Sequence, residues 1–449
     1  MKSLPRRWFK VFSAFLAVAA FVAVATSPAA AAQGPWILPP KTLPGSPAAQ
    51  VDNIEVAVGP GKTATAVWVE RERNGNSDHS DDRWRLRATT RPAFGKFRRP
   101  VTLTSIPATN NGLRSTEVTA GAAGTLVSWI RDEKRQRFVE YRFRPTGGKF
   151  GPVRTFPDQP NPWSLITGRG SDGTLALAWD SESGVQVAIR LPRTGTWKTF
   201  DFGTDEGANL TDIAIGPDRD VIVTWDIRDM GGPTKPRAGL IRNASTLGPA
   251  RTLAEKGRRP KVAFSPRGDA MFVWFQGNPS SIFGEKMGPQ GGLGDPFQVS
   301  QPGRPGHGDI QPDVVIGGNG EISVVYLTNR RKYFGGDGYE AYRNLTVATR
   351  KPGSGFRYRL MGQGVDHNAR NPRIVASADG TTTVLWDESS EIHSSTRPPG
   401  GDYPRQSTRI ANGSAWTVDL ASALDGTAVA VWLVRSPNGV RLLTASTRP

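Results

Sequence analysis

A short apolar segment, a tight turn and a second apolar segment recur along the chain, and each second segment ends in an aromatic residue. The string IAIGPDRDVIVTW, residues 213–225, shows the pattern, because turn residues separate two runs that are rich in Ile and Val. Two such runs joined by Gly, Pro, Asp or Asn are typical of a β-hairpin. The aromatic residues that end the eight predicted hairpins are Trp68, Trp129, Trp179, Trp225, Trp274, Tyr326, Trp386 and Trp432.

The spacing between these aromatic residues leaves room for two further strands in each repeat. Successive aromatic residues stand 46 to 61 positions apart. The third strand often ends in an arginine–proline step, as at Arg91-Pro92, Arg144-Pro145 and Arg397-Pro398. A period near fifty with β signals alone predicts a β-propeller with four-stranded blades. We expect the blades to start near residues 52, 114, 162, 209, 259, 311, 371 and 416.

The two ends of the chain predict that the ring is closed. The eighth repeat stops at Pro449 after its third strand, and residues 34–44 match the pattern of a fourth strand. Pairing the two ends would remove the free sheet edges that an open array leaves. We therefore predict an all-β fold, a single eight-bladed β-propeller over residues 33–449, whose last blade is completed by the N-terminal strand.

Residues 1–32 have the pattern of a secretory signal peptide. Four basic residues precede the apolar run 11–25, and Ala30-Ala31-Ala32 forms a small-residue cleavage site. We expect the mature protein to start at Gln33 and to be extracellular. The adjacent Arg6 and Arg7 leave two export routes open, the general secretory (Sec) route and the twin-arginine route. No later run is long enough to predict a membrane span.

Charge and composition narrow the chemistry. The formal net charge is +17, and residues 1–32 carry four bases and no acids, so the mature chain has 17 − 4 = +13. Such a basic protein should be attracted to an anionic polymer or glycan of the cell envelope; a general solubility bias is the alternative. The absence of Cys excludes disulfides and a Cys nucleophile. We expect a monomer without sequence-specific nucleic-acid binding.

The long predicted loops all belong to one face of the ring, the side opposite the tight turns between first and second strands. Loops on a rigid scaffold commonly carry binding sites. Bases and aromatic residues suited to a glycan or anionic ligand gather there; the ligand-binding candidates are Arg330, Arg331, Lys332, Tyr333, Phe334, His367 and Arg370. Asp78, Asp81 and Asp82 are candidates for holding Ca²⁺, the one cofactor considered, with an ordinary solvated acidic loop as the alternative.

A charged position recurs four residues before each first turn, at the start of the predicted innermost strand. The residues at this position are Glu55, Glu117, Ser164, Asp212, Lys261, Asp313, Arg373 and Asp419. From Asp212 to Asp419 the sign alternates, which predicts salt bridges between neighbouring blades. In a closed ring Glu55 and Glu117 follow Asp419, so that three consecutive blades carry an acidic residue at this position. These three carboxylates are therefore the candidates for acid–base catalysis or for holding a cation.

Two motifs carry a family resemblance. The turn Ser377-Ala378-Asp379-Gly380 precedes Trp386, and Thr-Arg-Pro-Pro-Gly-Gly stands at 396–401. With them the chain resembles secreted bacterial β-propeller proteins of the sialidase-like repeat type. Sialidase Asp boxes lie between third and fourth strands, however, whereas the Asp-Gly turns here lie between first and second strands. Trp-Asp pairs such as Trp225-Asp226 end second strands, unlike those of WD repeats, so neither family's functional residues carry over.

Three functions stay open on this evidence. The first is a secreted, non-catalytic propeller that binds an anionic or glycan ligand on its long-loop face. The second is a glycan-processing hydrolase or lyase that uses the carboxylates at the channel mouth. The third is a scaffold for protein interactions in the cell envelope. Propellers host all three, so the fold does not choose between them, nor whether the protein is an enzyme.

Overall fold

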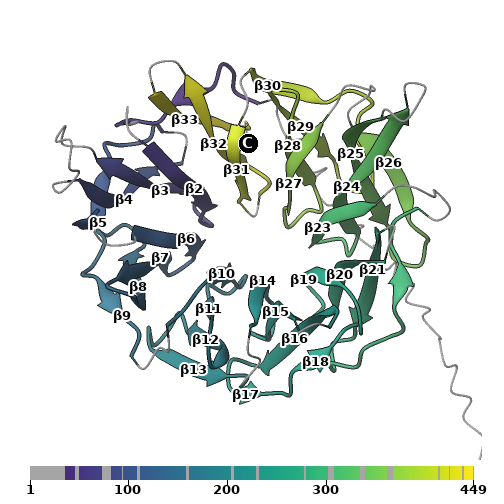
Figure 1. The fold of residues 1–449 in the computed structure, drawn as a ribbon, viewed down its shortest axis with the longest axis horizontal. Coiled ribbons are helices and arrows are strands. Elements are labelled where there is room, and N and C mark those ends of the chain that lie inside the picture. The colour runs from purple at the N-terminus through teal and green to yellow at the C-terminus, as the bar shows by residue number, and fades with distance from the viewer. Residues whose placement is uncertain are drawn as a thin grey trace, which may run out of the picture. The chain divides into compact units, whose positions relative to one another are not determined.

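Eight antiparallel sheets stand around a central opening in the computed structural model (Figure 1). The structure describes residues 36–45, 50–72, 82–93, 95–108, 112–157, 161–203, 207–228, 232–277, 280–301, 308–333, 339–361, 368–412, 415–423, 425–436 and 439–447. Strands and their connections make up all of these segments, and no helix occurs among them that could cross a membrane. The predicted eight-bladed β-propeller is confirmed.

Each blade places its first strand at the centre of the ring and its last strand at the rim. The innermost strands are β2 (Gln50–Val58), β6 (Gly112–Gly121), β10 (Leu165–Arg169), β14 (Asn209–Ile215), β19 (Arg258–Phe264), β23 (Asp309–Ile316), β27 (Ala369–Ala376) and β31 (Ala415–Ser422). The second strands are β3 (Ala64–Glu72), β7 (Gly124–Glu133), β11 (Leu175–Ser181), β15 (Val221–Arg228), β20 (Ala270–Gly277), β24 (Ile322–Tyr333), β28 (Thr382–Glu388) and β32 (Ala428–Ser436).

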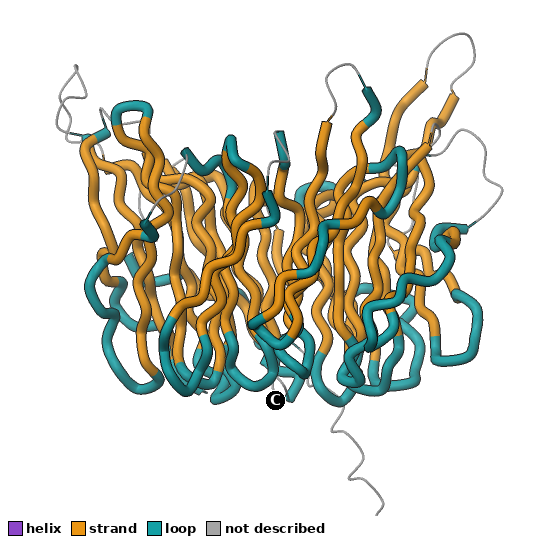
Figure 2. The backbone as a smooth tube through the Cα atoms, turned by 90° about the horizontal axis from the view of Figure 1, so that it is seen from below, coloured by secondary structure: helices purple, strands orange, loops and turns teal. Residues whose placement is uncertain are grey.

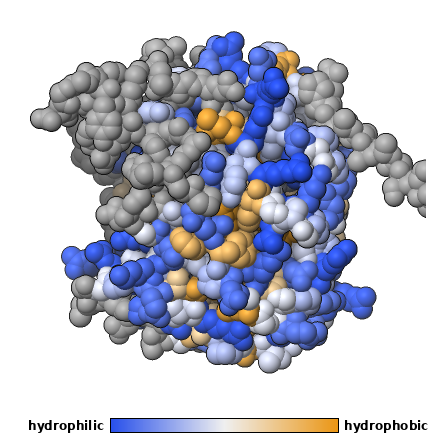
Figure 3. Space-filling model, turned by 90° about the vertical axis from the view of Figure 1, so that its right-hand side faces the viewer, coloured by the Kyte–Doolittle hydropathy of each residue, from blue (hydrophilic) through white to orange (hydrophobic). Residues whose placement is uncertain are grey.

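The outermost strand of each blade is shorter than the strand that it pairs with. The third strands are β4 (Arg83–Arg91), β8 (Gln136–Pro145), β12 (Gly184–Arg190), β16 (Thr234–Arg242), β21 (Ser280–Met287), β25 (Tyr339–Arg350), β29 (Glu391–Arg397) and β33 (Gly439–Ser446). The outermost are β5 (Val101–Pro107), β9 (Arg154–Thr155), β13 (Trp197–Asp201), β17 (Thr246–Leu247) with β18 (Arg251–Thr252), β22 (Phe297–Gln298), β26 (Arg357–Met361), β30 (Thr408–Asn412) and β1 (Lys41–Thr42). Along the rim beside β25 and β26, polar side chains surround small apolar patches (Figure 3).

The N-terminal strand closes the ring as predicted. β1 pairs with β33, the third strand of the last blade, so that Lys41 lies opposite Thr444. The N–H of Ile37 donates to the carbonyl of Ser446 at 2.8 Å. Trp36 is buried in the same apolar cluster as Trp432. Every inner strand also contacts its neighbours in the ring, including β2 with β31.

The recurrent aromatic residues form the cores between blades. All eight, from Trp68 to Trp432, are at most 2% exposed, which confirms their predicted burial. Several indole N–H groups find a carboxylate; those of Trp68 and Trp386 donate to Glu70 and Glu388, at 3.0 and 2.8 Å. In these blades the large ring is buried with its polar atom paired, whereas the indole N–H groups of Trp179 and Trp432 have no partner among the described residues.

The turns between first and second strands share one geometry and gather on one face of the ring (Figure 2). In seven blades the first turn residue donates its N–H to the carbonyl four residues later, as Gly216 does to Asp220 at 2.8 Å. The fourth turn residue has a positive φ, for example 93° at Gly380 and 61° at Arg219. This left-handed position explains the recurrent Gly of the sequence pattern.

Candidate active site

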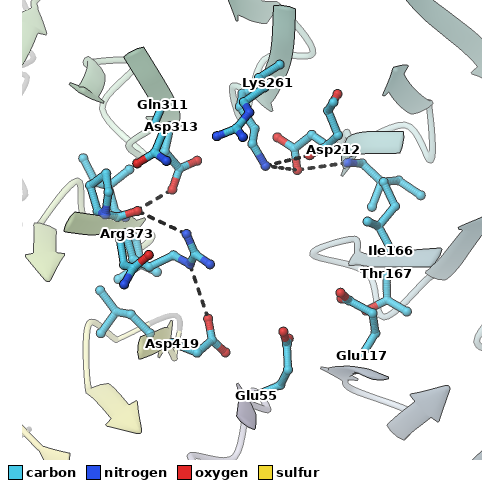
Figure 4. Close-up of a pocket in the computed structure, with 18 of the residues that line it drawn as sticks. Glu55, Glu117, Ile166, Thr167, Asp212, Lys261, Gln311, Asp313, Arg373 and Asp419 are labelled. Carbon is cyan, nitrogen blue, oxygen red and sulfur yellow. Dashed lines mark hydrogen bonds and ion pairs between the residues drawn. The ribbon is translucent and has the colours of Figure 1, made fainter. Parts of the chain in front are cut away.

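A central cavity of about 760 Å³ is lined by one recurring position from every innermost strand (Figure 4). The residues at this position, which we call the ring, are Glu55, Glu117, Ile166, Asp212, Lys261, Asp313, Arg373 and Asp419. Seven of them agree with the sequence prediction. The cavity is therefore a polar chamber inside an otherwise apolar propeller.

The eighth ring residue is a correction. The sequence GRGSDG offers two glycines as the start of the third turn, and the prediction of Ser164 follows from choosing Gly168. The structure starts that turn at Gly170, whose N–H donates to the carbonyl of Thr174 at 2.7 Å. Ile166 therefore takes the ring position. Ser164 lies beside Asp180 instead and donates its hydroxyl to that carboxylate at 2.6 Å.

A β-bulge precedes the ring residue in most blades. In five blades the pairing of the innermost strand with the second strand shifts register directly before the ring residue, for example between Ile310 and Asp313 and between Arg370 and Arg373. β10 pairs with β11 without such a shift. A bulge reorients the side chain that follows it. The repeat pattern predicted that the ring residues stand at the start of the innermost strands. The structure places them further inside these strands; β2, for example, begins five residues before Glu55.

The bulge has a signal in the sequence that the pattern search missed. A residue with positive φ, a proline and the ring residue follow one another at 259–261, 311–313 and 371–373, with φ of 51°, 53° and 49° at Arg259, Gln311 and Asn371. Both carboxylate oxygens of Asp226, from the preceding blade, accept the N–H of Arg259 at 3.0 Å. The bulge is thus held by a neighbouring blade. Gln311 and Asn371 thereby join the lining of the cavity.

The alternating half of the ring, Asp212 to Asp419, is held by the scaffold. Its three aspartates each accept a backbone N–H from the next innermost strand: Asp212 from Val262 at 3.0 Å, Asp313 from Ile374 at 3.3 Å, and Asp419 from Val56 at 2.8 Å. Two of the predicted salt bridges form: Lys261 Nζ lies 4.0 Å from Asp212 Oδ1, and Arg373 Nε lies 3.9 Å from Asp419 Oδ1. These charges consequently stabilise the junctions between blades.

Glu55 and Glu117 form the other side of the chamber, next to Asp419 (Figure 4). Neither glutamate forms an ion pair with a base in the described part of the chain. Burial and the negative charges of Glu117 and Asp419 raise the pKa of Glu55 well above its usual value. Burial and the charge of Asp419 raise the pKa of Glu117 to about 8. At neutral pH the Glu117 carboxyl is therefore mostly protonated.

Arg169 lies outside the lining of the cavity and ties the strands of the three carboxylates together. Its guanidinium donates to the carbonyl of Val58 on β2, of Ala120 on β6 at 3.0 Å, and of Ser422 on β31 at 2.8 Å. Each of these carbonyls lies three residues after a ring carboxylate. Arg169 thereby fixes the relative positions of the strands that carry Glu55, Glu117 and Asp419. The sequence pattern contained no signal for this role, because one arginine among many reaches across three blades.

The remaining predicted site residues do not reach the cavity or lie outside the described residues. Arg370 is exposed on β27 and does not line the cavity. The β24 backbone carries four of the predicted ligand-binding residues, whose side chains are outside the description; these are Arg330, Arg331, Lys332 and Tyr333. The residues that lie outside the described segments altogether are Asp78, Asp81, Phe334 and His367.

The proposed calcium loop is described only at its last member. Asp82 is buried, 1% exposed, and its carboxylate lies 3.2 Å from the Arg71 guanidinium. A carboxylate paired with arginine in this way is a structural ion pair. Within the described segments, no three acidic or histidine side chains come together in a group that could hold a metal ion.

No family model and no curated protein matches the chain. Among solved structures it is similar to the polysaccharide lyase Uly1, with a TM-score of 0.46, 10% identity, and coverage of 74% of this chain and 89% of that one. An α-L-arabinanase of Penicillium chrysogenum complexed with arabinobiose gives a TM-score of 0.43, 12% identity, and coverage of 91% and 97%. A structure from an analysis of two prolyl endopeptidases gives a TM-score of 0.47, 11% identity, and coverage of 86% of this chain and 55% of that one. The chemistry of the cavity therefore has to be argued from its own residues.

Proposed function

We propose that the central cavity cleaves a glycan by acid–base catalysis, with Glu117 as the proton donor and Asp419 as the base. The observation that carries the proposal is the cluster of three carboxylates, two of which lack a basic partner among the described residues. Carboxyl groups whose environments separate their protonation states are the usual acid–base pairs of enzymes.

The environments of Glu117 and Asp419 support opposite roles. Glu117 has a pKa of about 8, so it holds a proton that it can give to a leaving oxygen at neutral pH. Burial raises the pKa of Asp419 as well, but the Arg373 guanidinium that it faces and the Val56 N–H that it accepts at 2.8 Å act against that rise by favouring the ionised form. Glu55 lies between the two in the order of the ring. Burial and the charges of both neighbours raise its own pKa, so Glu55 is the carboxyl of the cluster that is hardest to ionise beside them.

The lining of the chamber suits a polyhydroxylated substrate. Amide and hydroxyl side chains from four different blades face the cavity; they are Thr167, Asn209, Thr211, Gln311 and Asn371. Such groups both donate and accept hydrogen bonds, as recognition of sugar hydroxyls requires. The volume of about 760 Å³ lies within the range of small-molecule sites. A short segment of a glycan chain is therefore the ligand class that fits the cavity.

Substitution of the acid tests the proposal. We expect Glu117→Gln to lower kcat/KM on the cleaved glycan by about 10²- to 10⁴-fold, the usual contribution of a general acid. Wild-type activity should fall as pH rises through about 8, because Glu117 then loses its proton. Glu255→Gln is the matched control, because the Glu255 side chain is 82% exposed at the surface. A panel of neutral and acidic polysaccharides, assayed for reducing ends and for unsaturated products, separates hydrolysis from elimination.

Glycan binding without catalysis is the alternative function if no glycan is cleaved. Binding of a glycan without cleavage, unchanged in Glu117→Gln, would contradict catalysis and support the non-catalytic binding function.

We also propose that the protein acts outside the cell, since residues 1–32 have the pattern of a signal peptide. An N-terminus at Gln33 on protein recovered from the medium would support export.

A further inference from the structure

A second cavity, of about 290 Å³, lies at the seam between the first and the last blade, on the side of the tight turns. We call it the seam pocket. Its lining combines basic side chains with apolar ones: Lys41, Lys62, Arg91 and Lys96 with Ile37 and Phe97. The pocket is separate from the ring, because the two cavities share no lining residue.

Arg91 occupies a position that recurs in other blades at the end of the third strand. Arg144 and Arg397 are its equivalents, since each is followed by proline and stacks on an aromatic residue six positions later. The three guanidiniums lie 5.6, 5.4 and 5.7 Å from the ring centres of Phe97, Phe150 and Tyr403. The three arginines can therefore be compared directly.

The two equivalent arginines have hydrogen-bond partners from the scaffold. Arg144 donates to the hydroxyl of its cross-strand neighbour Thr125 and to Thr65 of the preceding blade, both at 3.1 Å. Arg397 donates to its cross-strand neighbour Thr382 at 3.2 Å. It also contacts the preceding blade, with hydrogen bonds to Ser323 at 3.3 Å and Glu321 at 3.1 Å.

Arg91 lacks these partners. Its cross-strand neighbour is Ala64, where the equivalents have threonine. In the preceding blade, the second residue of the second strand is Val429, where Thr65 and Ser323 stand for the equivalents. The Nε atom of Arg91 is buried and has no hydrogen-bond partner among the described residues. Arg91 thus has the same charge and stacking as its two equivalents but none of the hydroxyl partners that they have.

The seam pocket fills the place of the missing partners. Lys96 and Lys41 are exposed at its edge, and both line it. Lys62 is paired with Asp425 at 2.5 Å, so part of its charge is already neutralised. Phe97 and Ile37 add apolar surface beside these charges. A half-buried guanidinium whose Nε has no hydrogen-bond partner among the described residues, in a pocket that two ammonium groups also line, attracts an oxyanion.

We propose that the seam pocket binds a small oxyanion carried on an apolar body, with the anionic group on Arg91 and Lys96 and the body against Phe97 and Ile37. Phosphate, sulfate and carboxylate share this chemistry. The pocket volume admits a group of about the size of a substituted aromatic ring. This site is independent of the carboxylate cluster and of its proposed activity.

Titration calorimetry with phenyl phosphate tests the site. Phenyl phosphate should bind more tightly than inorganic phosphate, and phenol should not bind, because both the charge and the ring contribute. Benzoate and phenyl sulfate in parallel rank the three oxyanions. Arg91→Gln should weaken phenyl phosphate binding at least tenfold, with an unchanged circular dichroism spectrum as the check on folding.

The repeat provides a matched control for the lysine. Lys96 and Lys149 occupy the same position of the sequence Gly-Lys-Phe in the first and second blades, and both are exposed. Lys96→Gln should weaken phenyl phosphate binding severalfold and Lys149→Gln should not. Equal affinity of Lys96→Gln, Arg91→Gln and wild type, or no binding by wild type at millimolar ligand, would overturn the proposal. Glu117→Gln should bind phenyl phosphate like wild type, which separates this site from the proposed function.

Discussion

At the scale of single residues, the ring shows how partners decide what a carboxylate does. Asp212 and Asp313 have the same side chain and ring position as Asp419, and all three accept a backbone N–H from the next strand. Asp212 and Asp419 also lie near a base, whereas no base in the described segments forms an ion pair with Glu55 or Glu117. Burial and the negative charge of Asp419 raise the pKa of both glutamates, which makes them suited to proton transfer.

Arg169 acts on these residues without touching the proposed substrate position. It contacts three carbonyls, one on each strand that bears a carboxylate of the cluster. A charged donor that satisfies several buried carbonyls stabilises the junction of the strands that carry them. It is therefore a positioning residue for the site.

We expect Arg169→Met to lower the free energy of unfolding by about 2–4 kcal/mol, because three carbonyls lose their donor together. Chemical denaturation measures the loss. Arg193→Met is the control, since Arg193 is exposed in a surface turn and its replacement should stay within about 0.5 kcal/mol. Arg169→Met should also lower kcat of the folded enzyme more than it raises KM. An Arg169→Met variant as stable as wild type would show that water replaces the guanidinium without cost.

At the scale of elements, seven blades share one turn geometry, all eight bury an aromatic residue at the same position, and one element differs in origin. The last blade obtains its outermost strand from the other end of the chain. Trp36 anchors that segment, is 8% exposed, and packs in the cluster that contains Trp432. The closure of the ring thus depends on one short segment with a large buried side chain.

We expect Trp36→Ala to lower the free energy of unfolding by about 3–5 kcal/mol, because it removes a buried aromatic ring and loosens β1. Trp163→Ala provides the comparison, since Trp163 is 44% exposed and its loss should be within about 0.5–1 kcal/mol. Thermal unfolding followed by circular dichroism measures both. Equal losses for the two variants would mean that the N-terminal segment does not hold the ring closed.

At the scale of the whole molecule, the repeat made the fold predictable and left much of the site unpredictable. Eight aromatic residues at regular spacing fix the number of blades, and the missing last strand points to Trp36. The ring residues follow from the repeat wherever the turn is unambiguous. The prediction of Ser164 failed because the third repeat has two candidate glycines, and only the hydrogen bond of Gly170 decides between them.

The seam pocket and the role of Arg169 depend on contacts between blades that are distant in sequence. Arg91 looks like Arg144 in the sequence, and the difference lies in Val429, more than three hundred positions away. Pairings of this kind follow from ring closure, which a local pattern does not contain.

The most direct test of the account is the protonation state of Glu117. Infrared difference spectroscopy during a pH titration, compared between wild type and Glu117→Gln, isolates the carboxyl band of this one residue. The raised pKa predicts a protonated carboxyl that persists at pH 7 and disappears as pH rises through about 8, and that is missing from Glu117→Gln. A difference spectrum in which this carboxyl has lost its proton by about pH 5, near the ordinary value for glutamate, would contradict the proposed acid–base site.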